Sequence, residues 1–210
     1  MPSPNGFLIA FEGPEGAGKS TQLGLAASVL RRAGRSTRES FEPGATRLGE
    51  SIRQLLLHER AAVPIPLAEL FLYLADRAQH VAEVIQPALQ NGDIVLTDRF
   101  SGSTLAYQGF GRELDYALVV QADAWARAGV GPQLTILLDC PVGVGLRRAH
   151  GSDRFHAEVE AFHERVRHGF LSLAAQDATW HVVDATEPVA TVHERVMAAI
   201  LACLQRGESA

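Results

Sequence analysis

A glycine-rich stretch near the start of the chain restricts what this sequence can fold into more than any other feature. Residues 13–20 read Gly-Pro-Glu-Gly-Ala-Gly-Lys-Ser and match the phosphate-binding loop pattern G-x-x-x-x-G-K-[ST]. An apolar run at residues 7–11 precedes the loop, and a helical pattern at residues 21–33 follows it. This is the strand–loop–helix context that the motif requires, so the stretch predicts a buried strand, a phosphate site and a helix.

The residue types in this loop suit a nucleotide phosphate. Glycine lets backbone N–H groups turn inward and has no side chain to keep phosphate oxygens away from them. The N-terminus of the following helix carries a partial positive charge that favours an anion. Lys19 is a mobile cation for the β- and γ-phosphates, and Ser20 offers a hydroxyl to Mg²⁺. A glycine-rich turn without a ligand is the less favoured explanation.

The rest of the chain alternates short apolar runs with helical patterns, which is typical of a parallel sheet. Pro87 is expected to kink the longest helix. Five strands flanked by helices predict a single doubly wound α/β domain over residues 1–210, with its ligands at the carboxyl ends of the strands. Strands are expected at residues 7–11, 35–41, 94–97, 134–138 and 180–183, and helices at 21–33, 48–57, 67–89 and 188–204.

Composition narrows the kind of partner. The net charge of −5 argues against a broad nucleic-acid-binding surface. No apolar run is long enough to span a membrane, so no membrane partner is expected, and the lack of a signal peptide predicts a cytoplasmic protein. Cys140 and Cys203 lie far apart in apolar segments, which favours buried free thiols over a disulfide.

Two polar motifs follow predicted strands. Asp98 and Arg99 come after the third strand, where a carboxylate can hold Mg²⁺ beside the phosphate loop and a guanidinium can bind a second phosphate. Alternatively, Asp98 only caps the structure that follows it. Glu42-Pro-Gly comes after the second strand and is either part of a site or an ordinary turn.

Other stretches also have two explanations. Tyr73 and Arg77 are four residues apart on one helix face, where they could bind a base; alternatively, Arg77 forms a surface ion pair with Asp76 or Glu69. The polar, aromatic and glycine-rich residues 101–111 either line a pocket or form a mobile loop.

The Arg-rich connector at residues 147–154 reads Arg-Arg-Ala-His-Gly-Ser-Asp-Arg. Such a segment suits a lid that closes over a transferring phosphoryl group, whereas the alternative is a solvated run of charges. His156 and His163 have no acidic or cysteine partners in a metal-site pattern, so no structural zinc is predicted.

Together these motifs resemble the thymidylate kinases, specifically the bacterial type that supplies an arginine from its lid. The resemblance covers nearly the full length, and its most discriminating part is Ala-Tyr-Gln-Gly at residues 106–109. The other motifs occur in the family's order: the phosphate loop, Glu42-Pro-Gly44, Tyr73-Leu-Ala-Asp-Arg77, Asp98-Arg-Phe100 and Asp153-Arg154.

The resemblance implies a P-loop NTPase fold of the nucleoside monophosphate kinase type. It also implies transfer of the γ-phosphoryl group of ATP to dTMP, giving dTDP and ADP, with ATP and Mg²⁺ as cofactors. The implied partners are dTMP, ATP and a second copy of the chain, since the family is usually homodimeric. The alternative is another nucleoside or deoxynucleoside monophosphate kinase of the same fold. A GTP switch is disfavoured, because the chain has no Asn-Lys-x-Asp sequence.

The resemblance also implies roles for individual residues in the acceptor site. Arg77 would hydrogen-bond thymine while Tyr73 stacks on it, and Tyr107 would crowd the sugar 2′ position. Thr104 and Gln108 would meet the base edge. Pro43 would be the family's cis proline. The full set of implied substrate-binding residues is Glu42, Arg53, Tyr73, Arg77, Arg99, Thr104, Tyr107 and Gln108.

A further set of roles concerns ATP and catalysis. Some family members carry an arginine inside the phosphate loop, where this chain has Gly16. The catalytic cation is therefore expected from the lid at residues 147–156, from Arg154 with Arg147 and Arg148 as helpers. Ser20 and Asp98 are the implied metal ligands. The implied catalytic residues are Glu15, Lys19, Asp98, Arg99 and Arg154, and the implied nucleotide-binding residues are Gly13, Pro14, Glu15, Gly16, Ala17, Gly18, Lys19, Ser20, Thr21 and Arg148.

Overall fold

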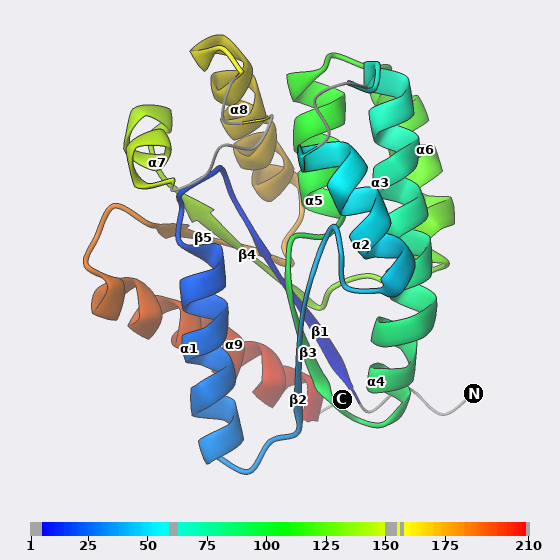
Figure 1. The fold of residues 1–210 in the computed structure, drawn as a ribbon. Coiled ribbons are helices and arrows are strands. Elements are labelled where there is room, and N and C mark those ends of the chain that lie inside the picture. Colours follow the sequence, from blue (N-terminus) through cyan, green and yellow to red (C-terminus); the bar gives the residue numbers. More distant parts are fainter. Residues whose placement is uncertain (1–5, 59–62, 150–154, 156–157, 209–210) are drawn as a thin grey trace.

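Five parallel strands form a single sheet in the order β2-β3-β1-β4-β5, and the computed structural model describes residues 6–58, 63–149, 155 and 158–208 (Figure 1). The middle strands β1, β3 and β4 are buried along almost their whole length, as expected of parallel strands covered on both faces. The prediction of a five-stranded parallel α/β fold is confirmed. The strands are β1 (Phe7–Glu12), β2 (Thr37–Phe41), β3 (Ile94–Asp98), β4 (Leu134–Asp139) and β5 (Trp180–Asp184).

Helical segments fill the connections between the strands. Most are regular α-helices, and three are wider π-helical turns, labelled η. In chain order they are α1 (Lys19–Arg32), α2 (Arg47–Arg53), η1 (Gln54–His58), α3 (Pro66–His80), η2 (Val81–Ile85), α4 (Gln86–Gln90), α5 (Ser101–Thr104), η3 (Leu105–Gly111), α6 (Tyr116–Arg127), α7 (Val142–Arg148), α8 (Glu160–Gln176) and α9 (Val189–Glu208).

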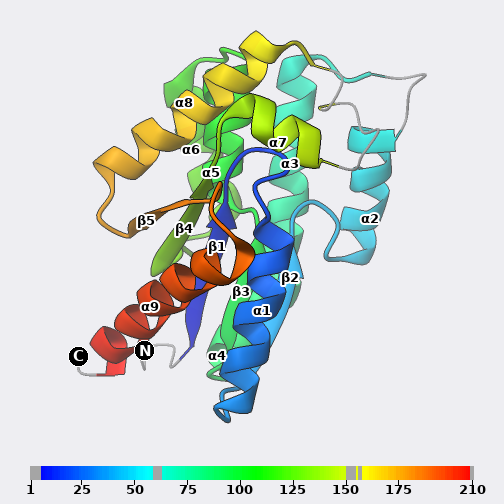
Figure 2. The same ribbon diagram turned by 90° about the vertical axis from the view of Figure 1, so that its left-hand side faces the viewer.

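The helices cover both faces of the sheet (Figures 1 and 2). Successive strand residues point to opposite faces, so Ile9 and Phe11 of β1 pack with α1 and α9, whereas Leu8 packs with η2 and α4. On the same side as Leu8, Leu137 of β4 shares a core with η3 and α8. The sheet is thus the middle of three layers.

The register of the strands brings the predicted motifs to one edge of the sheet. Asp98 at the end of β3 is paired with Phe11 of β1 and with Phe41 of β2. The segments that follow these residues are the phosphate loop, the Glu42 turn and Arg99, so all three leave the sheet side by side. As predicted, the Glu42–Pro43 peptide bond is cis.

Several helices differ from the sequence expectations. Residues 101–111 are helical rather than a mobile loop, so that alternative is wrong. The long helix expected at 67–89 is divided into α3, η2 and α4, with the wider turn just before Pro87, whose missing N–H interrupts regular helical bonding. Helices α6, α7 and α8 were not located from the sequence.

The structure also bears on the two cysteines and on membrane-spanning segments. Cys140 and Cys203 are both buried free thiols, so the disulfide alternative is wrong. Among the described residues, no helix is both long enough and apolar enough to cross a membrane.

Candidate active site

The phosphate loop leaves β1 at Gly13 and enters α1 at Lys19. Gly13, Gly16 and Gly18 all have positive φ angles, of 144°, 67° and 88°, which a side chain would strain. The Nζ atom of Lys19 donates to the carbonyl oxygens of Gly13 (3.1 Å) and Pro14 (2.8 Å). Burial lowers the pKa of Lys19 to about 8. The loop therefore holds a partly desolvated cation that phosphate oxygens would stabilise.

Asp98 faces the loop rather than the helix after it. The hydroxyl of Ser20 donates to Oδ2 of Asp98 at 2.5 Å. Helix α5 has no side chain capping it from its N-cap residue; instead, Oε1 of Glu12 accepts the N–H groups of Phe100 (2.9 Å) and Ser103 (3.0 Å). The alternative that Asp98 is only a cap is therefore wrong, and its carboxylate lies where the loop meets β3.

Glu12 links the phosphate loop to the segment after β3. Its side chain is fully buried, and this desolvation raises the pKa of Glu12 to about 7. The hydroxyl of Ser103 donates to Oε2 of Glu12 (2.6 Å) and accepts from Nη1 of Arg99 (2.9 Å). Glu12 thus supports Arg99 through Ser103.

Arg99 lies between the loop and the helical segment at 101–111. It has a positive φ of 74°, which is uncommon for a residue with a side chain. Its guanidinium lies 5.1 Å from the centre of the Tyr107 ring, and Nη2 lies 3.4 Å from the phenol oxygen. Burial raises the pKa of Tyr107 to about 12, so the phenol remains neutral beside the guanidinium.

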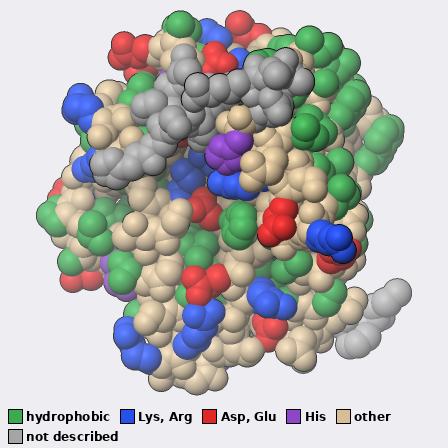
Figure 3. Space-filling model, viewed as in Figure 1, with side chains coloured by type: hydrophobic (Ala, Val, Ile, Leu, Met, Phe, Trp, Pro, Cys, Tyr) green, Lys and Arg blue, Asp and Glu red, His purple; other side chains and the backbone are tan. Residues whose placement is uncertain are grey.

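A cavity of about 740 Å³ opens at this edge of the sheet, and Figure 3 shows basic and acidic side chains gathered in a hollow near the centre of this face. Every predicted substrate-binding residue lines it. Its walls include Glu15, Lys19, Ser20, Glu42, Arg53, Tyr73, Arg77, Asp98, Arg99, Thr104, Tyr107, Gln108 and Phe155.

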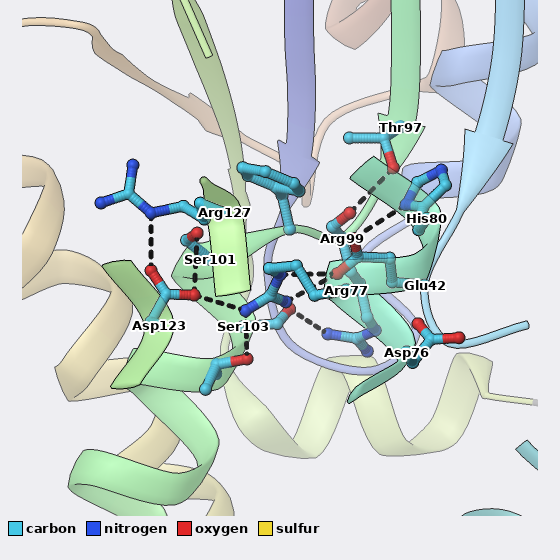
Figure 4. A network of polar contacts seen from close by, with 12 residues as sticks. Glu42, Asp76, Arg77, His80, Thr97, Arg99, Ser101, Ser103, Asp123 and Arg127 are labelled. Carbon is cyan, nitrogen blue, oxygen red and sulfur yellow. Dashed lines mark hydrogen bonds and ion pairs between the residues drawn. The ribbon is translucent and has the colours of Figure 1, made fainter. Parts of the chain in front are cut away.

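Arg77 lies in the wall of this cavity, not on the surface (Figure 4). Its side chain is 2% exposed and pairs with the carboxylates of Glu42 and Asp123, each at 2.6 Å. The alternative of a surface ion pair with Asp76 or Glu69 is therefore wrong. Burial opposes the charge, but these carboxylates raise the pKa of Arg77, so it is a permanent cation.

Glu42 is held in turn by a buried histidine. Oε1 of Glu42 lies 2.8 Å from Nδ1 of His80, and Nε2 of His80 lies 2.6 Å from the hydroxyl of Ser40. Burial would raise the pKa of Glu42, but Arg77 and His80 hold it below its usual value. The Glu42-Pro-Gly segment is therefore more than an ordinary turn, because its carboxylate is part of the wall that holds Arg77.

Two other predicted acceptor-site residues are anchored in the wall. The amide nitrogen of Gln108 donates to Glu69 at 2.9 Å, and Glu69 also accepts from Arg112. The Nη1 atom of Arg53 donates to the carbonyl oxygen of Pro43 at 2.7 Å. These bonds fix both side chains at the cavity before any ligand is present.

A second cavity of similar volume, about 740 Å³, lies on the other side of the phosphate loop. It is lined by residues 16–22, by Arg148 and Ala149, and by the segment 185–189 after β5. Arg148 donates to the carbonyl oxygen of Ala185 at 2.7 Å. Arg154, the predicted lid cation, lies outside the described residues.

Helix α7 packs directly against the phosphate loop. A Cβ atom built at Gly16 would collide with the carbonyl oxygen of Gly145, and one built at Gly145 would collide with the carbonyl oxygen of Glu15. This close approach leaves no room for a side chain at position 16. An arginine at this position would require α7 to lie farther from the loop.

Sequence reasoning missed several residues of this site. Glu12 ends β1, and the segment 185–189 follows β5. Their positions at the carboxyl ends of strands, where ligands are expected, could have identified them. Ser103 and Phe155 line the first cavity. Asp123 pairs with Arg77, and no motif in the sequence marks it as part of a site.

Comparisons with known proteins agree with this geometry. A family model described as thymidylate kinase matches residues 11–196. The thymidylate kinase of Geobacter sulfurreducens is 48% identical, and the match covers 88% of this chain and 91% of that protein. The thymidylate kinase of Thermosynechococcus vestitus is 46% identical, and the match covers 96% of this chain and 89% of that protein. The crystal structure of thymidylate kinase from Ehrlichia chaffeensis matches with a TM-score of 0.76 and 32% sequence identity. The match covers 94% of this chain and 99% of that chain. The chain therefore belongs to the thymidylate kinase family and phosphorylates dTMP to dTDP.

Proposed function

We propose that ATP occupies the second cavity, that dTMP occupies the first, and that the phosphoryl group passes between them beside Lys19. The observation that carries this proposal is that the two cavities share Gly16, Lys19, Ser20 and Ala149 as lining residues. An oxygen of the dTMP phosphate bonds to the γ-phosphorus, the bond to the β–γ bridging oxygen breaks, and ADP leaves. Because no covalent intermediate is needed, the protein chiefly positions both reactants and stabilises their charge.

The base of dTMP is assigned to the end of the first cavity formed by α3 and residues 101–111. Arg77 donates to a thymine carbonyl, Tyr73 stacks on the ring, and Thr104 and Gln108 meet the base edge. Tyr107 crowds the 2′ position and so favours deoxyribose. Support comes from the position of all five side chains in one cavity wall.

The 5′-phosphate of dTMP is assigned to Arg53 and Arg99, which line the same cavity as Lys19. Glu15, also a lining residue, is assigned to the sugar 3′-hydroxyl. Glu42 acts by holding Arg77. Since the chain is acidic overall, these local arginines supply the positive charge that a phosphate requires.

Ser20 and Asp98 are assigned to Mg²⁺. Both present oxygen atoms, which this cation prefers, and the assignment is supported by the 2.5 Å hydrogen bond that places the two oxygens side by side. Mg²⁺ is commonly bound by one or two protein side chains together with substrate phosphates. When bound, it would offset charge on the β- and γ-phosphates.

Two arginines of the proposed lid are assigned different roles, one in binding ATP and one in catalysis. Arg148 is anchored to the rim of the ATP cavity through Ala185 and Thr186, so it binds ATP. Arg154 stabilises the charge of the transferring phosphoryl group, because the packing of Gly16 against α7 leaves no room for an arginine at position 16 of the loop. The short lid at residues 147–156 belongs to the same domain as the rest of the chain.

Steady-state kinetics of two variants test this division. With ATP, Mg²⁺ and dTMP in a coupled ADP-release assay, Arg154→Ala should lower kcat by roughly two to three orders of magnitude with little change in KM for ATP. Arg148→Ala should instead raise KM for ATP by about tenfold. Arg31→Ala, at an exposed ion pair with Glu39, is the control for loss of an arginine. Near-wild-type kcat in Arg154→Ala would move the catalytic role to another lid arginine.

We also assign a homodimer and a cytoplasmic location by membership of the family. Exposed apolar side chains on α3 and α6 support the dimer, among them Phe71, Leu118 and Trp125. Residues 118 and 125 are seven apart and so lie on one face of α6. A face of this kind on a folded domain is typical of an assembly surface.

A further inference from the structure

Asp123 is the one partner of Arg77 that belongs to none of the motifs described above. It lies on α6, is 2% exposed, and accepts from Nη1 of Arg77 (2.6 Å) and from the hydroxyl of Ser101 (3.0 Å). Its other oxygen forms an ion pair with Nε of Arg127 at 2.8 Å. We propose that Asp123 is a positioning residue that sets the base specificity of the enzyme by fixing the guanidinium of Arg77; this inference rests on the base-binding role proposed for Arg77.

The hydrogen bonds of Arg77 leave a single donor for a ligand. An arginine side chain has five N–H groups in one plane. Nε and Nη2 of Arg77 each donate to Oε2 of Glu42, at 2.9 and 2.6 Å, and Nη1 donates to Thr104 at 2.8 Å and to Asp123. Four groups are thus committed, and within the described residues the fifth, on Nη2, has no protein partner.

The guanidinium is held from several sides (Figure 4). Glu42 approaches from the turn after β2 and Asp123 from α6, and the ring of Phe100 lies 5.1 Å from the guanidinium carbon. Bonds from two carboxylates and a hydroxyl fix the plane and its rotation, so they also fix the direction of the free N–H. Glu42 alone would leave the side chain free to turn about that contact.

This fixed donor distinguishes bases by what they present to it. A guanidinium can only donate, so it binds a carbonyl oxygen and leaves an amino group facing another donor. Thymine and 5-methylcytosine are nearly the same size. They differ at position 4, where one has a carbonyl and the other an amino group, and at N3, which carries a hydrogen only in thymine. Discrimination of this kind is strong only where the polar group of the site cannot move to another partner.

The experiment compares dTMP with 5-methyl-dCMP in the wild type and in Asp123→Asn. The wild type should prefer dTMP. In the variant, kcat/KM for dTMP should fall about tenfold, mainly through KM, while the value for 5-methyl-dCMP changes little, so the preference shrinks about tenfold. A purely structural role for Asp123 would lower both values together and leave their ratio unchanged.

Two further variants complete the test. Asp115 accepts from the N–H of Leu118 at the start of α6, so Asp115→Ala destabilises the same helix without touching Arg77 and should keep the wild-type ratio. If Asp123→Asn does not fold, Asp123→Glu keeps the charge but displaces the carboxylate by one methylene, and it should also reduce the ratio.

The outcomes separate this inference from the function on which it rests. A wild type that does not discriminate between the two acceptors would overturn the role of Arg77. A wild type that discriminates, with variants at Asp123 that discriminate equally well, would overturn the role of Asp123 alone. An equal loss of discrimination in Asp115→Ala would also overturn it, because the effect would then come from the stability of α6.

Discussion

At the scale of single residues, Glu12 shows how a buried carboxyl group can organise a site without touching a substrate. Its carboxylate accepts three hydrogen bonds from Phe100 and Ser103, which lie 88 and 91 residues further along the chain. Through these bonds the end of β1 fixes the start of α5 and the hydroxyl that supports Arg99. The phosphate loop and the acceptor site therefore share one buried anchor.

The pKa of Glu12 gives a prediction about stability. In the folded protein burial raises this pKa from 4.5 to about 7, so between these pH values the folded state binds more protons than the unfolded state. The stabilisation from protonated Glu12 is complete below about pH 4.5 and is lost as the pH rises to about 7. Glu12→Gln removes this titration, because an amide is neutral throughout.

Urea unfolding at pH 5 and pH 8 measures the effect. The wild type should lose about 1–3 kcal/mol of unfolding free energy between pH 5 and pH 8 that Glu12→Gln does not lose. Glu50→Gln, at an exposed carboxylate on α2, should show no such change. Parallel pH dependence in Glu12→Gln and the wild type would mean that Glu12 does not titrate in this range.

At the scale of elements, α7 and the phosphate loop approach each other backbone to backbone. Gly16 and Gly145 let two backbones meet where any side chain would collide. The last two residues of α7, Arg147 and Arg148, are also the first two of the proposed lid, so this helix joins the proposed lid to the loop without an intermediate element.

Paired glycine substitutions isolate this contact. Gly16→Ala and Gly18→Ala both place a side chain at a positive φ angle, which costs about 1–2 kcal/mol. Only at position 16 does the new Cβ meet another backbone, since the space at Gly18 is open. In thermal unfolding without nucleotide, Gly16→Ala should therefore lose about 1–3 kcal/mol more than Gly18→Ala. Equal losses would show that α7 can move away at little cost.

Strands and strand-end motifs could be predicted because their signals are local. The apolar runs of β1, β3 and β4 are continuous, and polar residues follow each strand at the edge where the parallel strands end. The residues assigned to the acceptor were identified instead through the resemblance to thymidylate kinases, and they line one cavity.

Helix α6 could not be located because its pattern is weak. Its described buried residues are only Val119 and Asp123, one of them charged, so no apolar stripe marks the inner face. The pairing of Asp123 with Arg77 joins residues 46 positions apart, and no local signal indicates which helix faces will meet. Residues 101–111 were open to misinterpretation because glycines and polar residues at a buried site look like those of a loop.

At the scale of the whole molecule, the exposed apolar side chains on α3 and α6 predict self-association. Trp125 is 77% exposed, and placing a carboxylate at the centre of an apolar interface is strongly unfavourable. Trp125→Glu should therefore convert the dimer into a monomer in light scattering and sedimentation. Leu25→Glu, at a 38% exposed position on α1, should remain dimeric. A wild-type enzyme that is already monomeric at micromolar concentration would contradict the assignment.

The position of α6 has an evolutionary consequence. One short helix carries Trp125 on the face assigned to assembly and Asp123 on the face that holds Arg77. A mutation selected for tighter or looser assembly can tilt this helix and thereby alter which nucleotide is accepted. Relatives in which the assembly surface on α6 has changed should then also carry changes around Arg77. Assembly and nucleotide specificity are expected to evolve together.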